Sequence, residues 1–116
     1  MQPRARVWIE RGGAAALTDA GADLLEQIQA TGSLSQGARV LGFSYRRAWM
    51  LLDAMNRRWD APLVVTAVGG KRGGGATLTE YGNRVLRSFR DLQIHVEAAI
   101  EQEIEGFRRA TTLPAH

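Results

Sequence analysis

The feature that most restricts the fold is a long apolar stripe near the C-terminus. Over residues 80–109, apolar side chains recur at the spacing of one helical face. At about 1.5 Å per residue such a helix would be about 45 Å long, more than one small domain can cover. We therefore expect it to pair with a second copy of the chain, making a homodimer. The expected dimer interface is Val85, Phe89, Leu92, Val96, Ile100 and Ile104.

Length and composition narrow the class of protein. A chain of 116 residues fits one domain. The absence of cysteine excludes a disulfide framework, a thiolate zinc site and a cysteine nucleophile. There is no apolar run of roughly 18 residues and no signal-peptide pattern, so we expect a cytoplasmic protein without a membrane partner. His95 and His116 are isolated and no carboxylates pair, which indicates neither a metal site nor an enzyme.

Capping residues and chain breakers divide the rest of the chain into short elements. Thr18, Ser33 and Ser44 each stand where a helix N-cap is expected, and Thr79 precedes the long helix. The expected fold is mainly α with a small β-hairpin. The expected helices cover 18–30, 33–41, 45–59 and 80–109, and the expected strands cover 5–10, 63–68 and 76–78.

The second and third helices have the proportions of a helix-turn-helix. Gly42 permits the sharp turn between them, Phe43 is expected to be buried at the bend, and Ser44 caps the third helix. Ala38 is small enough for close helix packing. In this motif the exposed N-terminal end of the third helix enters the major groove of DNA, and here that end is residues 45–50.

Positive charge is concentrated in the middle of the chain. Residues 39–72 hold seven basic and two acidic side chains, whereas each flank is mildly acidic. A glycine-rich hairpin tip at 69–75 carries Lys71 and Arg72, where a wing would meet phosphates. This tip lacks the lysine followed by serine or threonine of a phosphate-binding loop, so it does not predict a nucleotide site.

Alternatives remain for individual side chains. Arg46 and Arg47 fit DNA contact, although solvated surface charges would look the same in the sequence. Arg57 and Arg58 fit DNA contact and stabilisation of a helix C-terminus equally well. The three tryptophans, Trp8, Trp49 and Trp59, fit the core or an interface better than a ligand site.

Two motifs resemble one family of regulators. The segment GSLSQGARVLGFSYRRAW, followed by LLDAMN, and the later run GGKRGGGATLTEYGNRVL resemble the N-terminal domain of the ModE-type regulators, which respond to molybdate. The likeness covers roughly residues 18–95 and keeps SY-x-x-AW and GGK-x-GGGA-x-LT-x-YG in order. LysR-type regulators are similar over the helix-turn-helix and long helix but lack this glycine-rich wing.

The resemblance implies a winged helix-turn-helix at 1–78, a long dimerisation helix at 79–110 and a disordered tail at 111–116. It also implies a homodimer on a palindromic operator in double-stranded DNA, linked to molybdate transport or molybdenum metabolism. Met50 stands at a place that is often acidic in the family, so base preference there is expected to differ. The implied DNA-binding residues are Ser33, Ser35, Gln36, Ser44, Tyr45, Arg46, Arg47, Met50, Lys71 and Arg72.

The molybdate-binding domains of the family follow the long helix, and this sequence holds no counterpart. We therefore expect no cofactor on this chain; a separate molybdate-sensing protein is one partner that the resemblance leaves open. The sequence predicts a sequence-specific transcriptional regulator. The alternative is a winged-helix module that binds proteins and has no DNA sequence preference, because a fold does not fix a function.

Overall fold

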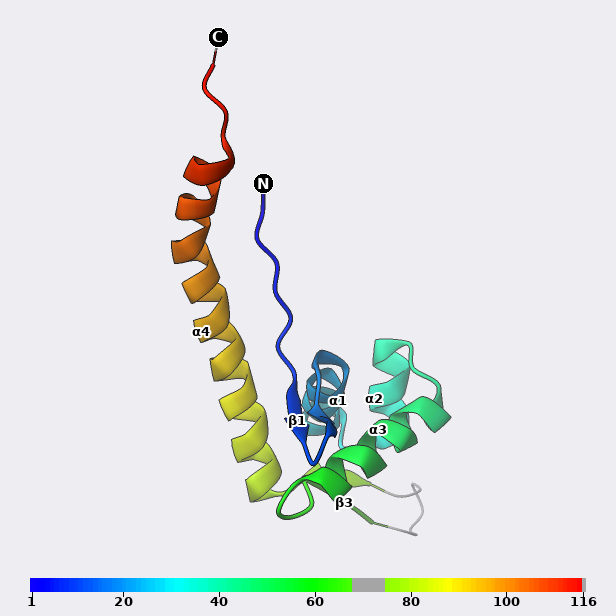
Figure 1. Cartoon of the computed structure of the whole chain (residues 1–116). Coiled ribbons are helices and arrows are strands. Elements are labelled where there is room, and N and C mark those ends of the chain that lie inside the picture. Colours follow the sequence, from blue (N-terminus) through cyan, green and yellow to red (C-terminus); the bar gives the residue numbers. More distant parts are fainter. Residues whose placement is uncertain (68–74, 116) are drawn as a thin grey trace.

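A computed structural model of the chain describes residues 1–67 and 75–115. The molecule is elongated, with extents of 73 × 28 × 22 Å, because one helix projects far beyond the rest (Figure 1). The mainly helical fold with a small hairpin and a long C-terminal helix is confirmed. Its elements are β1 (Ile9–Arg11), β2 (Ala14–Leu17), α1 (Asp19–Thr31), α2 (Leu34–Leu41), α3 (Tyr45–Arg58), β3 (Val64–Thr66), β4 (Ala76–Leu78) and α4 (Glu80–Thr111).

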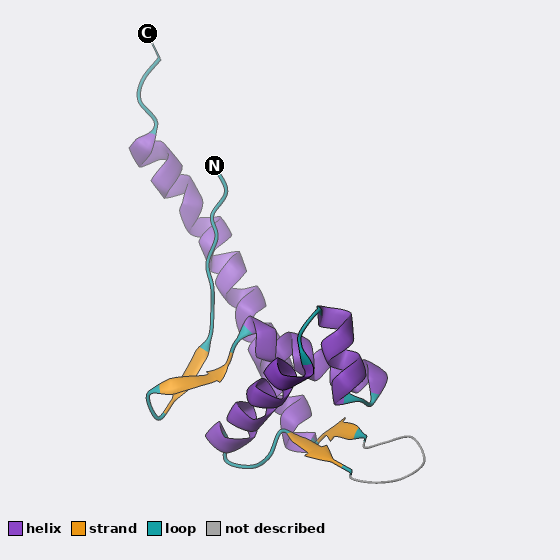
Figure 2. Cartoon of the chain, turned by 90° about the vertical axis from the view of Figure 1, so that its right-hand side faces the viewer, coloured by secondary structure: helices purple, strands orange, loops and turns teal. Residues whose placement is uncertain are grey.

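The strands form two antiparallel pairs (Figure 2). The expected hairpin pairs β3 with β4, with Val64 opposite Leu78. The other pair corrects the expectation of a lone strand over 5–10. The strand β1 begins only at Ile9, because its partner β2 ends opposite it at Leu17, next to the cap of α1. Two glycines with positive φ turn the chain between β1 and β2.

The predicted caps are confirmed at all four helices. Each capping hydroxyl accepts a hydrogen bond from the backbone N–H three residues further on, over 2.9–3.2 Å. The caps are Thr18, Ser33, Ser44 and Thr79. Gly32 and Gly42 end α1 and α2 in the left-handed conformation that favours glycine. Side-chain hydroxyls therefore set where each helix starts.

Helix α1 lies at the centre of the head, a name that we give to residues 9–67 and 75–89. It packs against α2, α3, α4 and β4, and its Leu24, Leu25 and Ile28 are fully buried. At the end of α3, the indole Nε1 of Trp59 donates a hydrogen bond to the carbonyl of Ala16 over 2.9 Å, tying α3 to β2. The expectation that Phe43 is buried is wrong, since this ring is only half-buried at the edge of the core.

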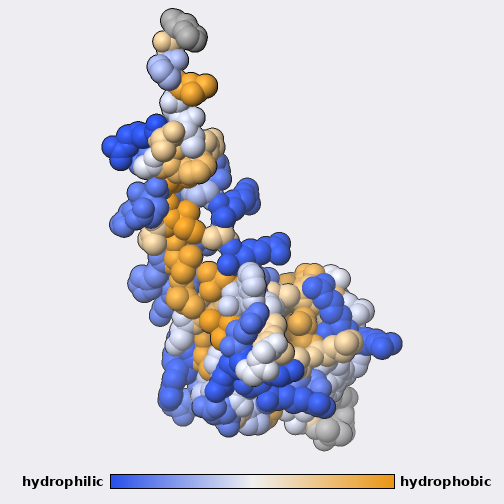
Figure 3. All heavy atoms as spheres, viewed as in Figure 1, coloured by the Kyte–Doolittle hydropathy of each residue, from blue (hydrophilic) through white to orange (hydrophobic). Residues whose placement is uncertain are grey.

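Helix α4 is covered by the head over its first turns only. Within the described part of α4 the buried side chains end at Phe89, and the helix then continues as an arm to Thr111, two residues beyond the expected end. This divides the predicted dimer stripe, because Val85 and Phe89 pack in the core of their own chain. The stripe continues on the arm, where an apolar band is visible in Figure 3. The stripe residues of the arm are Leu92, Val96, Ile100 and Ile104.

Among the described residues, none of the helices has both the length and the apolar character that crossing a bilayer requires.

The start of α4 generates a prediction about Gly82. A Cβ at this position would lie 2.0 Å from the carbonyl oxygen of Leu63, which is rigid backbone, so Gly82→Ala should lower the free energy of unfolding by about 2 kcal/mol or more. Urea denaturation measures this change. Gly106→Ala on the same helix is the matched control, because a Cβ there meets nothing within 4 Å and should be neutral or stabilise by up to about 1 kcal/mol. Equal effects of the two substitutions would contradict the close approach.

Candidate nucleic-acid interface

The turn between α2 and α3 is built from backbone contacts and small side chains. Gly42 has φ +71°, and the N–H of Phe43 donates to the carbonyl of Ala38 over 2.9 Å. Ala38 on α2 and Ala48 on α3 are both buried, so the two helices approach closely. This packing fixes which face of α3 points outward.

The outward face of α3 carries the residues that were predicted to be exposed. The side chains of Tyr45 and Met50 are 55% and 62% exposed, and Arg46 and Arg47 are exposed beside them. Trp49 is 41% exposed, and its ring meets that of Tyr45 edge-on, with 6.4 Å between the ring centroids. The N-terminal end of α3 therefore offers aromatic, apolar and cationic groups on one surface.

The two central arginines differ in their surroundings. The guanidinium of Arg47 lies 3.9 Å from the centroid of the Phe43 ring, so the side chain folds back over the turn. Arg46 and Arg47 both line a hollow of about 440 Å³ along α3 with Ser44, Met50, Leu51 and Ala54. Among the ion pairs of residues 1–67 and 75–115, none involves Arg46 or Arg47, so their charges are available to an anionic partner.

At the C-terminal end of α3 the picture changes. Arg57 Nε lies 3.1 Å from a carboxylate oxygen of Asp53 one turn earlier, and both side chains are exposed. An exposed pair of this kind contributes little stability. It does neutralise part of the charge of Arg57, which makes the N-terminal end of α3 the more cationic end.

The predicted residues of α2 have different roles. Ser33 is half-buried, and its hydroxyl caps the helix by accepting from the N–H of Gln36. Ser35 and Gln36 are exposed in the first turn of α2, at the positive end of the helix dipole. The second strand of the hairpin, β4, begins beside the N-terminus of α2, since the N–H of Ala76 donates to the carbonyl of Gly32 over 2.9 Å. Lys71 and Arg72, predicted on the wing, lie outside the described residues.

One residue that supports the candidate interface from behind, Asn56, was not predicted from the sequence. The Oδ1 of Asn56 on α3 accepts from the N–H groups of Leu63 and Val64, at 2.9 and 3.2 Å, and its Nδ2 donates to the carbonyl of Val64 at 3.0 Å. Asn56 thereby joins α3 to the start of β3, the first strand of the hairpin. The sequence shows only a polar residue at a half-buried position of the helix. It does not show that the side chain bonds to the backbone of Leu63 and Val64.

In the part of the chain that the structure describes, no group of three or more histidine, aspartate and glutamate side chains is placed to hold a metal ion.

Comparison with known proteins finds several relatives named ModE. The chain is 37% identical over 107 residues, 92% of its length, to a molybdenum transport protein ModE of Azotobacter vinelandii. Over 66 residues it is 52% identical to a transcriptional regulator ModE of Yersinia pestis and 47% identical to a DNA-binding transcriptional dual regulator ModE of Escherichia coli. The chain spans only 40% of the first of these proteins and 25% of the other two. No family model matches the chain.

A solved structure supports the fold. The full-length LysR-type regulator LysG of Corynebacterium glutamicum aligns with 82% of this chain, with a TM-score of 0.53 and 21% identity, and the match covers 30% of that protein. The likeness supports a winged helix followed by a long helix. The chain is therefore ModE-like in sequence and LysR-like in fold.

The contacts of Asn56 predict a large effect of its removal. Asn56→Ala leaves the N–H groups of Leu63 and Val64 without their acceptor and should lower the free energy of unfolding by about 2 kcal/mol. The control is Asp53→Ala on the exposed face of the same helix, which removes only a surface ion pair and should cost less than about 1 kcal/mol. Chemical denaturation of both variants is the measurement, and a cost no larger for Asn56→Ala than for the control would refute the tie between α3 and β3.

Proposed function

We propose that this chain is the DNA-binding part of a ModE-type, molybdenum-linked transcriptional regulator that acts as a homodimer on a palindromic operator. The observation that carries the proposal is the exposed N-terminal end of α3, where Arg46 and Arg47 have no carboxylate partner among the described residues. The similarity to proteins named as ModE transcriptional regulators, one of them named as DNA-binding, supports it. Such a protein works in the cytoplasm, beside the DNA that it regulates.

In this proposal the N-terminal end of α3 enters the major groove. Arg46 is free to extend and donate two hydrogen bonds to a guanine edge, and Met50 fits apolar contact with a thymine methyl group. Arg47, held over Phe43, is better placed for a phosphate beside the turn. Tyr45 stands at the first position of the helix, where a phenol reaches either a base edge or a phosphate.

Phosphate contacts outside α3 would fix the register on the duplex. Ser35 and Gln36 lie at the positive N-terminal end of α2, where backbone N–H groups favour anions. Ser33 and Ser44 contribute as caps that orient those N–H groups. Lys71 and Arg72 are proposed phosphate contacts of the wing, and their position lies outside the described residues.

The proposed dimer forms through the arm of α4. Leu92 is 39% exposed and Phe107 is 56% exposed, and they lie on the same apolar face as Val96, Ile100 and Ile104. Two such helices would exclude water by pairing along these faces. The two-fold symmetry of the pair matches a palindrome with half-sites about 34 Å apart, one turn of DNA.

The link to molybdenum depends on the names of the relatives. The chain corresponds to 40% or less of the length of each relative compared above. We therefore propose a response to molybdate for the regulatory system as a whole and assign no molybdate-binding residue to this chain. A sensing unit in a separate protein is one arrangement that fits.

The DNA-binding proposal predicts that the double variant Arg46→Ala/Arg47→Ala binds its operator at least about tenfold more weakly, because base and phosphate contacts are both lost. The operator is first selected from a random DNA pool with the unmodified protein. Fluorescence anisotropy over a salt series then gives affinity and salt dependence, and the double variant should show a shallower dependence.

Arg109→Ala serves as the control, since it removes a positive charge from the exposed end of α4. It should leave operator affinity almost unchanged. If the Arg46→Ala/Arg47→Ala dimer is intact and binds DNA as well as the unmodified protein, the chain is better explained as a protein-interaction module.

The dimer proposal predicts that Val96→Glu shifts the protein to monomers, because a carboxylate would be buried in the paired face. Ile94→Glu is the matched control, since Ile94 lies two residues away and therefore on a different side of the helix, where it is 62% exposed. Sedimentation equilibrium measures the mass of each variant. A dimer that survives Val96→Glu with unchanged affinity would place the interface elsewhere.

A further inference from the structure

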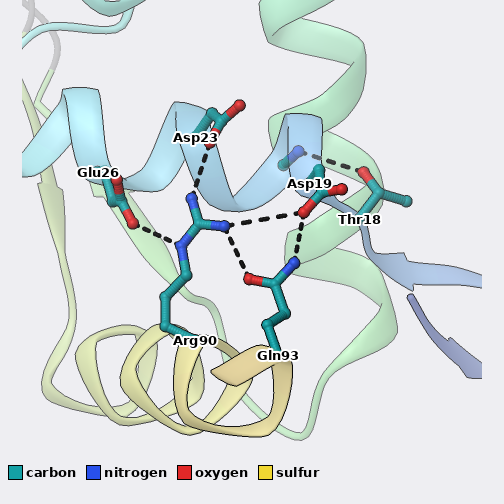
Figure 4. A network of polar contacts seen from close by, with 7 residues as sticks. Thr18, Asp19, Asp23, Glu26, Arg90 and Gln93 are labelled. Atoms are coloured by element: carbon teal, nitrogen blue, oxygen red, sulfur yellow. Dashed lines mark hydrogen bonds and ion pairs between the residues drawn. The ribbon is translucent and has the colours of Figure 1, made fainter. Parts of the chain in front are cut away.

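The contact between α1 and α4 is a polar seam beside the apolar core. The two helices run antiparallel along it, so that the end of α1 meets the start of α4. The side-chain amide of Gln29 donates to Asn83 at one end, and that of Gln93 donates to Asp19 at the other. Between these ends, Arg90 of α4 faces three acidic side chains of α1, as Figure 4 shows.

Arg90 uses all three of its nitrogens in this seam. Its Nε lies 2.6 Å from Glu26, its Nη2 lies 2.7 Å from Asp23, and its Nη1 lies 3.8 Å from Asp19. The Nη1 also donates to the side-chain oxygen of Gln93 over 2.9 Å. The planar guanidinium can hold several acceptors at fixed directions, whereas a lysine ammonium is a point charge on a flexible stem. The set of contacts therefore fixes a direction as well as a distance.

The charge of Arg90 is stable at ordinary pH. Desolvation by partial burial lowers its pKa, but the hydrogen bonds and charges of Glu26 and Asp23 outweigh this and raise the pKa above the ordinary value for arginine. The guanidinium thus stays protonated while it holds the three carboxylates.

Arg90 and Gln93 are the last α4 residues seen to bond to the head. Past Gln93, the one hydrogen bond from a described α4 side chain to another part of the chain runs from Arg108 to the carbonyl of Met1, which lies outside the head. The part of the arm from Gln93 to Thr111 is about 27 Å long at 1.5 Å per residue. A tilt of about 10° at Gln93 would move its end by about 5 Å, more than the rise of one base pair of DNA.

From this geometry we infer that Arg90 is a positioning residue that sets the angle between the head and α4, and through that angle the separation of the two recognition helices in the dimer. The inference rests on the proposed function. It assigns the choice of half-site spacing to the α1–α4 seam, which lies outside the candidate nucleic-acid interface, and the reading of bases to α3.

The angle can be measured without DNA. The sequence has no cysteine, so spin labels can be placed by substitution at two exposed positions, Val40→Cys on α2 and Gln102→Cys on α4. Labelled chains are diluted with unlabelled chains so that pulsed electron paramagnetic resonance reports the distance within one chain. In an Arg90→Met background the distance distribution should be at least about twice as wide as in the unsubstituted background, because the apolar stem remains and the hydrogen bonds are lost.

Arg87→Met is the control, because Arg87 is an exposed arginine of the same helix and is not part of the α1 contacts described above. It should leave the distribution unchanged. Should Arg90→Met fail to fold, the Asp23→Asn/Glu26→Gln variant removes the same ion pairs from the other side and is expected to widen the distribution in its place. An unchanged width in the folded variant overturns the inference.

The consequence for DNA is tested with operators in which the half-site spacing is changed by about two base pairs, which rotates one half-site by roughly 70°. The unmodified protein should lose about tenfold or more in affinity, because DNA or protein must twist. The Arg90→Met dimer should discriminate less than about threefold, with single half-site affinity unchanged. Arg90→Lys should resemble Arg90→Met, since a lysine cannot hold three acceptors at fixed directions.

The outcomes separate the two proposals. If the unmodified protein has no preference for spaced half-sites, the proposed function is wrong, and the role of Arg90 in spacing falls with it. If the unmodified protein is selective and Arg90→Met is equally selective, the inference alone is overturned.

Discussion

The packing of α1 is the constraint on which the rest of the structure depends. One side of this helix buries Leu24, Leu25 and Ile28 in the core, and each such side chain contributes about 1.5–3 kcal/mol when fully buried. The adjoining edge presents Asp19, Asp23 and Glu26 to Arg90 of α4. A single helix thus orients the helix-turn-helix through apolar contact and the long arm through ion pairs. These two edges of α1 therefore set how the candidate interface on α3 is placed relative to the arm.

Much of the fold could be predicted from local chemistry. The N-caps at Ser33 and Ser44 and the glycine at position 42 define α2, the turn and the start of α3, because the hydroxyl and the missing side chain act within a few residues. The same is true of the β3–β4 hairpin. By contrast, β2 was missed because an alanine-rich strand carries no β-branched or aromatic signal.

Contacts between different elements could not be predicted from the sequence. Helical periodicity reveals one stripe from Val85 to Ile104, but it cannot show that the head covers the stripe as far as Phe89. The bonds of Asn56 to Leu63 and Val64 and the ion pairs of Arg90 likewise join residues that only the fold brings together. For the candidate interface, periodicity does predict that α3 exposes Tyr45 and Met50. The position of Arg47 over Phe43, which distinguishes it from Arg46, depends on the geometry of the turn.

The α1–α4 seam determines where two related chains can be joined to make a chimera that keeps the seam intact. Because the first turns of α4 are bonded to α1 as far as Gln93, the boundary between head and arm does not coincide with the start of the helix. A chimera joined at Thr79 would separate Arg90 from its acidic partners, whereas one joined beyond Gln93 would carry the whole seam with the head. Recombination between relatives is therefore expected to preserve the α1–α4 seam when the crossover lies in α4 beyond Gln93.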